Sequence, residues 1–140
     1  MDQKIEKAKV LVPNEVINYA DGGIVSKEFA HSNAGSITLF AFDEGQGLSE
    51  HSAPFDATVE VIDGEAEVRI DGIAHTVKTG EMIIMPANHP HALRAHKRFK
   101  MVLTMIREKQ RYPLFSRAKD GIRRSFVRDF LVFRVVLLML

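Results

Sequence analysis

The sequence predicts an all-β fold, a small antiparallel β-barrel or jelly roll, with a helix near its carboxyl end. Turn-forming pairs end at Gly64, Gly72 and Gly80, and this regular spacing of eight residues is typical of an antiparallel meander. The segments around these glycines alternate apolar and polar residues, as half-buried strands do. Before residue 107 no segment has the longer apolar periodicity of a helix. Many short strands with frequent Gly and Pro indicate a sandwich or barrel.

The alternation defines the candidate strands and their buried faces. Two sets of apolar residues should point into the core on either side of the Asp63-Gly64 turn: Ala57, Val59 and Val61, and then Ala66, Val68 and Ile70. The other candidate strands are residues 35–42, 73–78, 82–85, 91–95 and 99–106. β-Branched residues and a Gly-Gly turn between residues 10 and 32 predict one or two further strands.

The length of 140 residues allows one hydrophobic core and is too short for two ordinary ones. We divide the chain into amino-terminal strands (residues 1–34), a barrel (35–107) and a tail (108–140). The chain contains no cysteine, which excludes disulfides, thiolate metal ligands and cysteine nucleophiles. Any metal must therefore be bound by His, Asp or Glu.

The net charge of +1 hides an acidic body and a basic tail. Residues 1–106 contain 10 basic and 15 acidic side chains, a net charge of −5, whereas residues 107–140 contain 9 and 3, a net charge of +6. An acidic body argues against nucleic acid as a partner, because binding phosphates requires a positive surface. The first residues lack the basic start and long apolar run of a secretion signal, so we expect a cytoplasmic protein.

Two motifs with fixed spacing frame the middle of the chain. The first consists of Gly45, His51, Ala53, Ala57 and Gly64, and the second of Gly80, Pro86, Asn88, His91 and Ala95. Their spacing resembles that of the cupin superfamily, whose first motif reads Gly, five residues, His-x-His, three or four residues, Glu, six residues, Gly. The second family motif reads Gly, five residues, Pro-x-Gly, two residues, His, three residues, Asn. The resemblance spans residues 35–106 and implies a small single-domain barrel, RmlC-like and of cupin type 2.

The resemblance also implies where a metal would bind. In metal-bearing cupins, the two histidines and the glutamate of the first motif coordinate one ion together with the histidine of the second. This chain keeps His51 and His91 but has Ala53 and Ala57 at the other two positions, and a methyl group has no lone pair to donate. Because catalytic metals generally need three protein ligands, we expect a degenerate site that binds a divalent metal weakly at best, and we predict no cofactor.

Few other side chains can replace the missing ligands. Glu50 and Glu60 should point away from the site if strand alternation holds, which leaves Asp56 as the one plausible substitute. His89 lies in a loop and either reaches the mouth of the pocket or, as the favoured alternative, faces solvent. The remaining histidines, two expected on the surface and one with no partner that the sequence identifies, are His75, His96 and His31.

The same region predicts a pocket for a small molecule. Its expected lining is mainly apolar with two imidazoles, and consists of His51, Ala53, Phe55, Ala57, Met85 and His91. In the alternative, side chains fill this space and hydrogen bonds or water satisfy the imidazoles. His51 and His91 could also act as a general acid and base, because imidazole titrates near neutrality, but the sequence does not identify the proton they would move.

The tail has the pattern of an amphipathic helix, with apolar residues at spacings of three or four: Ile122, Phe126, Phe130, Phe133 and Leu137. Its last eleven residues include Arg134 and are too few to span a bilayer, which takes about 20 apolar residues. The tail could bind an anionic membrane surface, dock onto the barrel or a second subunit, or have no function of its own. We favour the last two.

Three functions are compatible with these features. The leading hypothesis is a non-catalytic or vestigial cupin that binds or senses a small ligand, as a homodimer. The alternative is a metal-dependent enzyme, such as a dioxygenase, isomerase or decarboxylase, that uses His51, His91 and an unidentified third ligand. A structural or interaction protein that makes its contact through the tail is the third. Ala53 and Ala57 favour the first hypothesis.

Overall fold

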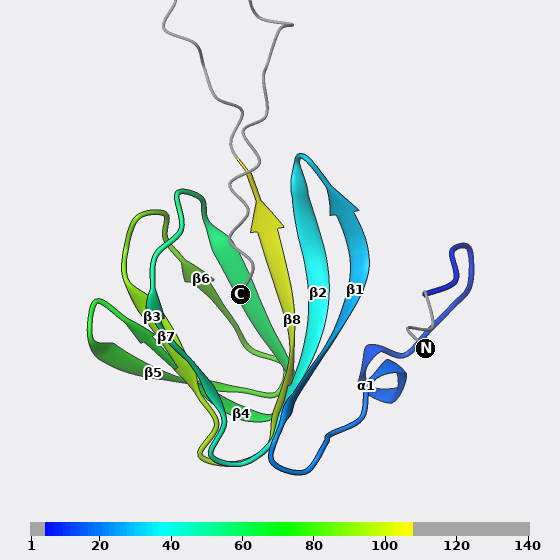
Figure 1. The fold of residues 1–140 in the computed structure, drawn as a ribbon, viewed down its shortest axis with the longest axis horizontal. Coiled ribbons are helices and arrows are strands. Elements are labelled where there is room, and N and C mark those ends of the chain that lie inside the picture. The colour runs from blue at the N-terminus through cyan, green and yellow to red at the C-terminus, as the bar shows by residue number, and fades with distance from the viewer. Residues whose placement is uncertain (1–4, 108–140) are drawn as a thin grey trace, which may run out of the picture.

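The computed structural model describes residues 5–107, which form a curled antiparallel sheet with very little helix (Figure 1). Hydrogen-bonded neighbours follow the order β1-β2-β8-β4-β7-β3, and β5 and β6 also pair with β4. The elements are α1 (Pro13–Val16), β1 (Ile24–Ser32), β2 (Gly35–Phe42), β3 (Gly47–His51), β4 (Ala57–Ile70), β5 (Ile73–Lys78), β6 (Met82–Met85), β7 (His91–Arg94) and β8 (Phe99–Ile106). The predicted all-β antiparallel architecture is confirmed.

Two walls make up the sheet, and β4 belongs to both. The first wall contains β1, β2, β8, β6 and the first half of β4, and the second contains β3, β7, β5 and the second half of β4. Figure 1 shows the walls meeting along one edge and diverging toward an open end. Strand β4 bends from one wall into the other near Gly64, where its pairing changes from β8 to β5 and β7.

The Asp63-Gly64 pair was expected to form a turn, and that prediction is wrong. Strand β4 continues through this pair, and its register against β8 shifts between Val61 and Asp63. Gly64 has φ +71, and a Cβ added there would lie 2.1 Å from the carbonyl oxygen of Arg98. The β-bulge therefore lies at Ile62, and Gly64, two residues later, is where the backbone of the neighbouring segment comes too close for a side chain.

The other two glycine turns are confirmed. Asp71 and Gly72 have φ values of +53 and +77 and connect the paired residues Ile70 and Ile73. Two consecutive left-handed residues between paired strands are the signature of a type I′ hairpin. Gly80, with φ +86, lies in the turn that connects β5 to β6.

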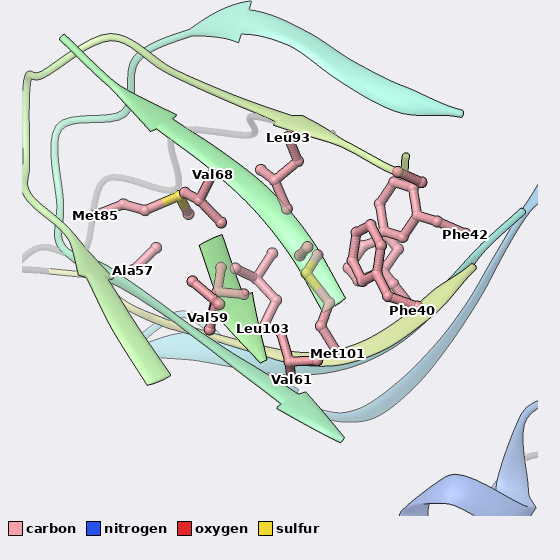
Figure 2. Packing of buried hydrophobic residues seen from close by; sticks show 14 residues of the cluster. Phe40, Phe42, Ala57, Val59, Val61, Val68, Met85, Leu93, Met101 and Leu103 are labelled. Carbon is pink, nitrogen blue, oxygen red and sulfur yellow. The ribbon is translucent and has the colours of Figure 1, made fainter. Parts of the chain in front are cut away.

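The core fills the space between the two walls (Figure 2). Of the residues expected to face inward on β4, Ala57 is 4% exposed, Val59, Val61, Ala66 and Val68 are fully inaccessible, and Ile70 is partly buried. Phe42 and Phe99 stack with ring centroids 4.6 Å apart. Figure 2 shows Ala57 and Met85 at one end of the core, and Phe42 at the other. Each fully buried Val, Leu, Met or Phe side chain contributes about 1.5–3 kcal/mol to stability.

The amino-terminal segment covers the outer face of the first wall. Residues 10–32 were expected to add one or two strands; they contribute β1 and also the short helix α1, which was not expected. Ile17 is 3% exposed and packs against Leu39 and Ala41. The buried Lys100 fixes the segment further, because its Nζ donates to the carbonyl oxygen and to Oδ1 of Asn14 at 2.7 and 2.8 Å.

Both predictions about the tail, the amphipathic helix and its docking, concern residues 108–140 and lie outside the described residues. Within residues 5–107 there is no helix that is long and apolar enough to cross a membrane.

Candidate functional site

His51 and His91 form a pair near the open end of the barrel. His51 is the last residue of β3 and His91 the first of β7, and the two are direct partners in the β3–β7 ladder. Their ring centroids lie 4.4 Å apart with an interplanar angle of 70°. The spacing of the two motifs therefore brings together two histidines that are 40 residues apart in sequence.

Backbone carbonyls hold both rings in the same tautomer. His51 Nδ1 lies 2.7 Å from the carbonyl oxygen of Ser49, and His91 Nδ1 lies 3.1 Å from that of His89. A carbonyl oxygen can only accept, so each Nδ1 carries the hydrogen and donates it. In a neutral imidazole this leaves the lone pair on Nε2. The pair consequently offers two Nε2 acceptors whose rings are fixed by the backbone.

Burial keeps His91 neutral at physiological pH. Its side chain is 4% exposed, and this desolvation lowers the pKa of His91 from its usual value. The nearby His51 lowers that pKa further, whereas the hydrogen bond to the His89 carbonyl opposes the shift. A buried imidazole beside a second one is disfavoured in its charged form on both counts. His91 is therefore better suited to accept a hydrogen bond than to act as a cation.

The structure buries the other four predicted pocket residues, Ala53, Phe55, Ala57 and Met85. Ala57 and Met85 are partners in the β4–β6 ladder and belong to the same core cluster. Ala53 and Phe55, in the connection between β3 and β4, are 8% and 4% exposed. The carbonyl oxygen of Ala53 accepts a hydrogen bond from Asn88 N at 2.7 Å, which joins this connection to the loop before β7. That the six residues line one ligand pocket stays a prediction.

The residues present do not fit the four-ligand metal site of the family motif. Ala53 and Ala57 supply no donor atom, and the described part of the chain contains no group of three or more His, Asp or Glu residues arranged to bind a metal. Asp56, the proposed substitute, is exposed and accepts a hydrogen bond from Ala87 N at 2.8 Å. No ligand set beyond the two imidazoles emerges from these residues.

The remaining histidines lie on the surface. His89 pairs with Asp71 at 2.7 Å and its side chain is half exposed, as expected for a loop histidine in solvent. His96 pairs with Glu67 at 2.6 Å, and His75 is exposed.

A partner for His31 could not be identified from the sequence. Its Nδ1 lies 3.1 Å from Glu28 Oε2. Residues three apart on a regular strand face opposite sides, but β1 has a register shift between Glu28 and Ala30 that breaks this alternation. A strand irregularity of this kind has no clear signal in the sequence.

Two buried polar residues near the open end were missed by the sequence analysis. Ser36 and Arg107 are 6% and 8% exposed, and Ser36 Oγ and Arg107 Nε are buried without a hydrogen-bond partner in residues 5–107. Strand alternation could have found Ser36, which shares the inward face of β2 with Phe40 and Phe42.

A separate groove of about 380 Å³ lies over β3 and β7, against Arg69 of β4. It is lined by Gly45, Gln46, Gly47, Leu48, Ser49, Arg69, Ala92, Leu93 and Arg94. None of the six residues predicted to line a pocket belongs to this groove, so it is not the predicted site.

The fold and the imidazole pair define a class of protein, a small antiparallel barrel with a histidine site near its open end. Residues 38–107 match the family described as Cupin domain. A conserved protein of unknown function from Streptococcus pyogenes is 36% identical with a TM-score of 0.73, and the match covers 76% of this chain and 94% of that one. The chain therefore belongs to the cupin family.

Two further solved structures are similar. A cupin 2 conserved barrel domain protein from Leptotrichia buccalis is 40% identical with a TM-score of 0.65, over 67% of this chain and 46% of that one. A cupin superfamily protein from Desulfitobacterium hafniense is 24% identical with a TM-score of 0.69, over 76% and 97% of the two chains, which supports the fold alone. A search of curated proteins found no match.

Proposed function

We propose that this cupin binds or senses a small molecule in its barrel and does not catalyse a metal-dependent reaction. The observation that carries the proposal is the replacement of two family ligands by Ala53 and Ala57, beside an intact and ordered His51–His91 pair. The motif spacing that builds the barrel is kept, while half of the donor atoms that bind the metal are gone.

The two imidazoles are suited to recognise hydrogen-bond donors on a ligand. Each ring has its Nδ1 engaged by a backbone carbonyl, so each Nε2 is free of that interaction and faces its surroundings as an acceptor. The core residues at this end, Ala57 and Met85, are apolar and contribute shape without charge. Small-molecule sites commonly combine such an apolar wall with a few fixed polar groups.

The competing function is a metal-dependent cupin enzyme. The same pair of Nε2 atoms favours it, since imidazole is a common ligand for zinc, copper, iron and nickel. Two protein ligands are fewer than the three that catalytic zinc sites use, so a third would have to come from elsewhere. Homodimer formation and a cytoplasmic location also remain proposals, and neither is required by the ligand-binding function.

Metal analysis and ligand screening together separate the two functions. Protein purified without a histidine tag is analysed for bound metal beside the variant His51→Ala/His91→Ala, with the exposed His75→Ala as a matched control. We expect less than stoichiometric metal in all three proteins. In a thermal-shift screen of small metabolites, we expect ligands that raise the Tm of the parent and of His75→Ala but not of the double variant. Near-stoichiometric metal that only the double variant loses would overturn this proposal and favour the metal-dependent alternative, which an activity assay would then have to establish.

A further inference from the structure

An unpaired hydroxyl lies on the inner face of the first wall. Ser36 is 6% exposed and its Oγ has no hydrogen-bond partner among the described residues. Ser36 pairs with Met105 of β8, Met105 pairs with Ala57 of β4, and Ala57 pairs with Met85 of β6. Cross-strand partners share a face of the sheet, so Ser36 lies in one row with two of the predicted pocket residues.

The second unpaired group is the guanidinium of Arg107, at the end of the β2–β8 ladder. Arg107 follows β8, and its backbone N donates to the carbonyl oxygen of Ala34 at 2.8 Å, one step beyond the pairing of Gly35 with Ile106. Alternation along the strand places Arg107 on the same face as Met105. Ser36 and Arg107 therefore lie on one face of the β2–β8 ladder, near the end of that ladder.

The described residues give the guanidinium of Arg107 one hydrogen-bond acceptor and leave its Nε without a partner. Arg107 is 8% exposed, its Nη1 donates to the Ser32 carbonyl oxygen at 3.2 Å, and its Nε is buried without a partner. Within residues 5–107 no carboxylate forms an ion pair with it. A buried guanidinium has five donors and a fixed charge, and it is normally compensated by an anionic oxygen group.

The imidazole pair lies on the facing wall at a comparable height above the bend. Ala57 is seven residues from Gly64 along the first half of β4, and Ile70, which pairs with His91, is six residues from Gly64 along the second half. A small molecule held between the walls at this height has Ser36 and Arg107 on one side and the imidazole pair on the other.

We propose that the ligand of this barrel is a small carboxylic acid, whose carboxylate binds Arg107 and Ser36 and whose hydrogen-bond donor binds the His51–His91 pair. This inference rests on the proposed ligand-binding function. Arginine binds carboxylates through parallel N–H···O bonds, and a serine hydroxyl can donate to the same group. The charge is complementary as well, because Arg107 is cationic whereas Ala57, Met85 and Met105 contribute no charge.

The test uses the full chain and four proteins: the parent, Arg107→Gln, Ser36→Ala and the control Arg94→Gln, which alters an exposed arginine on the outer face of β7. The probes are acetate, lactate, succinate and benzoate, each beside its neutral amide, with inorganic phosphate as a separate arm. Tm shifts identify binding, and titration calorimetry measures the affinity. We expect a carboxylate to bind more tightly than its amide. We expect Arg107→Gln to weaken that binding by about tenfold or more, as for the loss of a charged hydrogen-bond partner.

Ser36→Ala should weaken carboxylate binding several-fold, and Arg94→Gln should leave it unchanged. Without ligand, the Tm of Ser36→Ala should equal or exceed that of the parent, because the substitution removes a buried polar atom that lacks a partner. A fall in that Tm would mean that residues 108–140 or another group already satisfy Ser36, and would overturn the assignment.

Three other results would also overturn the inference: no carboxylate binds, amides bind as well as acids, or phosphate alone binds. If only neutral ligands bound, and their binding depended on His51 but not on Arg107, the carboxylate inference would be refuted and the proposed ligand-binding function would stand. If no probe and no metabolite bound, both the carboxylate inference and the proposed function would fail.

Discussion

Replacing Gly64 by alanine tests the account of how one strand builds both walls. Gly64 has φ +71, and an added Cβ would lie 2.1 Å from the Arg98 carbonyl oxygen, an overlap that only a backbone shift can relieve. Gly72 is the matched control, because it has φ +77 but no atom within 4 Å of the added Cβ. The two substitutions share the conformational strain and differ in the steric overlap.

The expected losses follow from these two terms. The left-handed conformation costs a residue with a Cβ about 1–2 kcal/mol, so Gly72→Ala should lose about that much stability. Overpacking adds about 1–3 kcal/mol, so Gly64→Ala should lose about 2–5 kcal/mol. Losses of this size are a large part of the stability of a small domain, about 5–15 kcal/mol.

Urea unfolding followed by circular dichroism measures both free energies of unfolding. We expect the midpoint to fall further for Gly64→Ala than for Gly72→Ala, with similar slopes for the two variants. Equal losses, within about 0.5 kcal/mol, would refute the close-contact explanation, since surface substitutions vary by that amount alone.

Three further outcomes are expected. Because the pKa of His91 is lowered in the folded state, the unfolded chain binds a proton more readily than the folded one. The contribution of His91 to stability is therefore present above the unfolded pKa of about 6.5 and declines as pH falls below it. NMR titration of the ring measures the pKa, and a value above 6.5 would contradict the burial argument. Lys100→Ala should free the amino-terminal segment from the wall and speed limited proteolysis near Asn14, and an unchanged cleavage rate would show that the buried amine is dispensable. In the variant Ala53→His/Ala57→Glu, zinc should raise the Tm, a chelator should reverse the rise, and the parent should show no such effect. If the variant folds but zinc does not raise its Tm, then positions 51, 53, 57 and 91 do not come together around one metal ion.

Much of the barrel could be predicted from sequence because strand alternation survives along its longest strand. The buried faces of β4 on both sides of Gly64 follow directly from that period. The Asp-Gly pairs at 63–64 and 71–72 look alike in sequence, yet only Asp71 has positive φ, as a type I′ turn requires. Whether such a pair forms a turn or continues a strand depends on the strand packed beside it, here β8.

The site was only partly predictable for a related reason. His51 and His91 were found because motif spacing carries them, and their register as direct partners agrees with that spacing. Ser36 and Arg107 carry no motif, and their significance comes from burial without a partner, which exists only once the chain is folded. The tautomers of the imidazoles depend likewise on two backbone carbonyls that no local pattern reveals.

The most direct test of the central claim is the metal content of the protein purified without a tag from medium containing zinc, iron, manganese, copper and nickel. The account predicts that no metal approaches one ion per chain and that His51→Ala/His91→Ala does not change the content. One tightly bound ion per chain, lost in that variant and retained in His75→Ala, would contradict it.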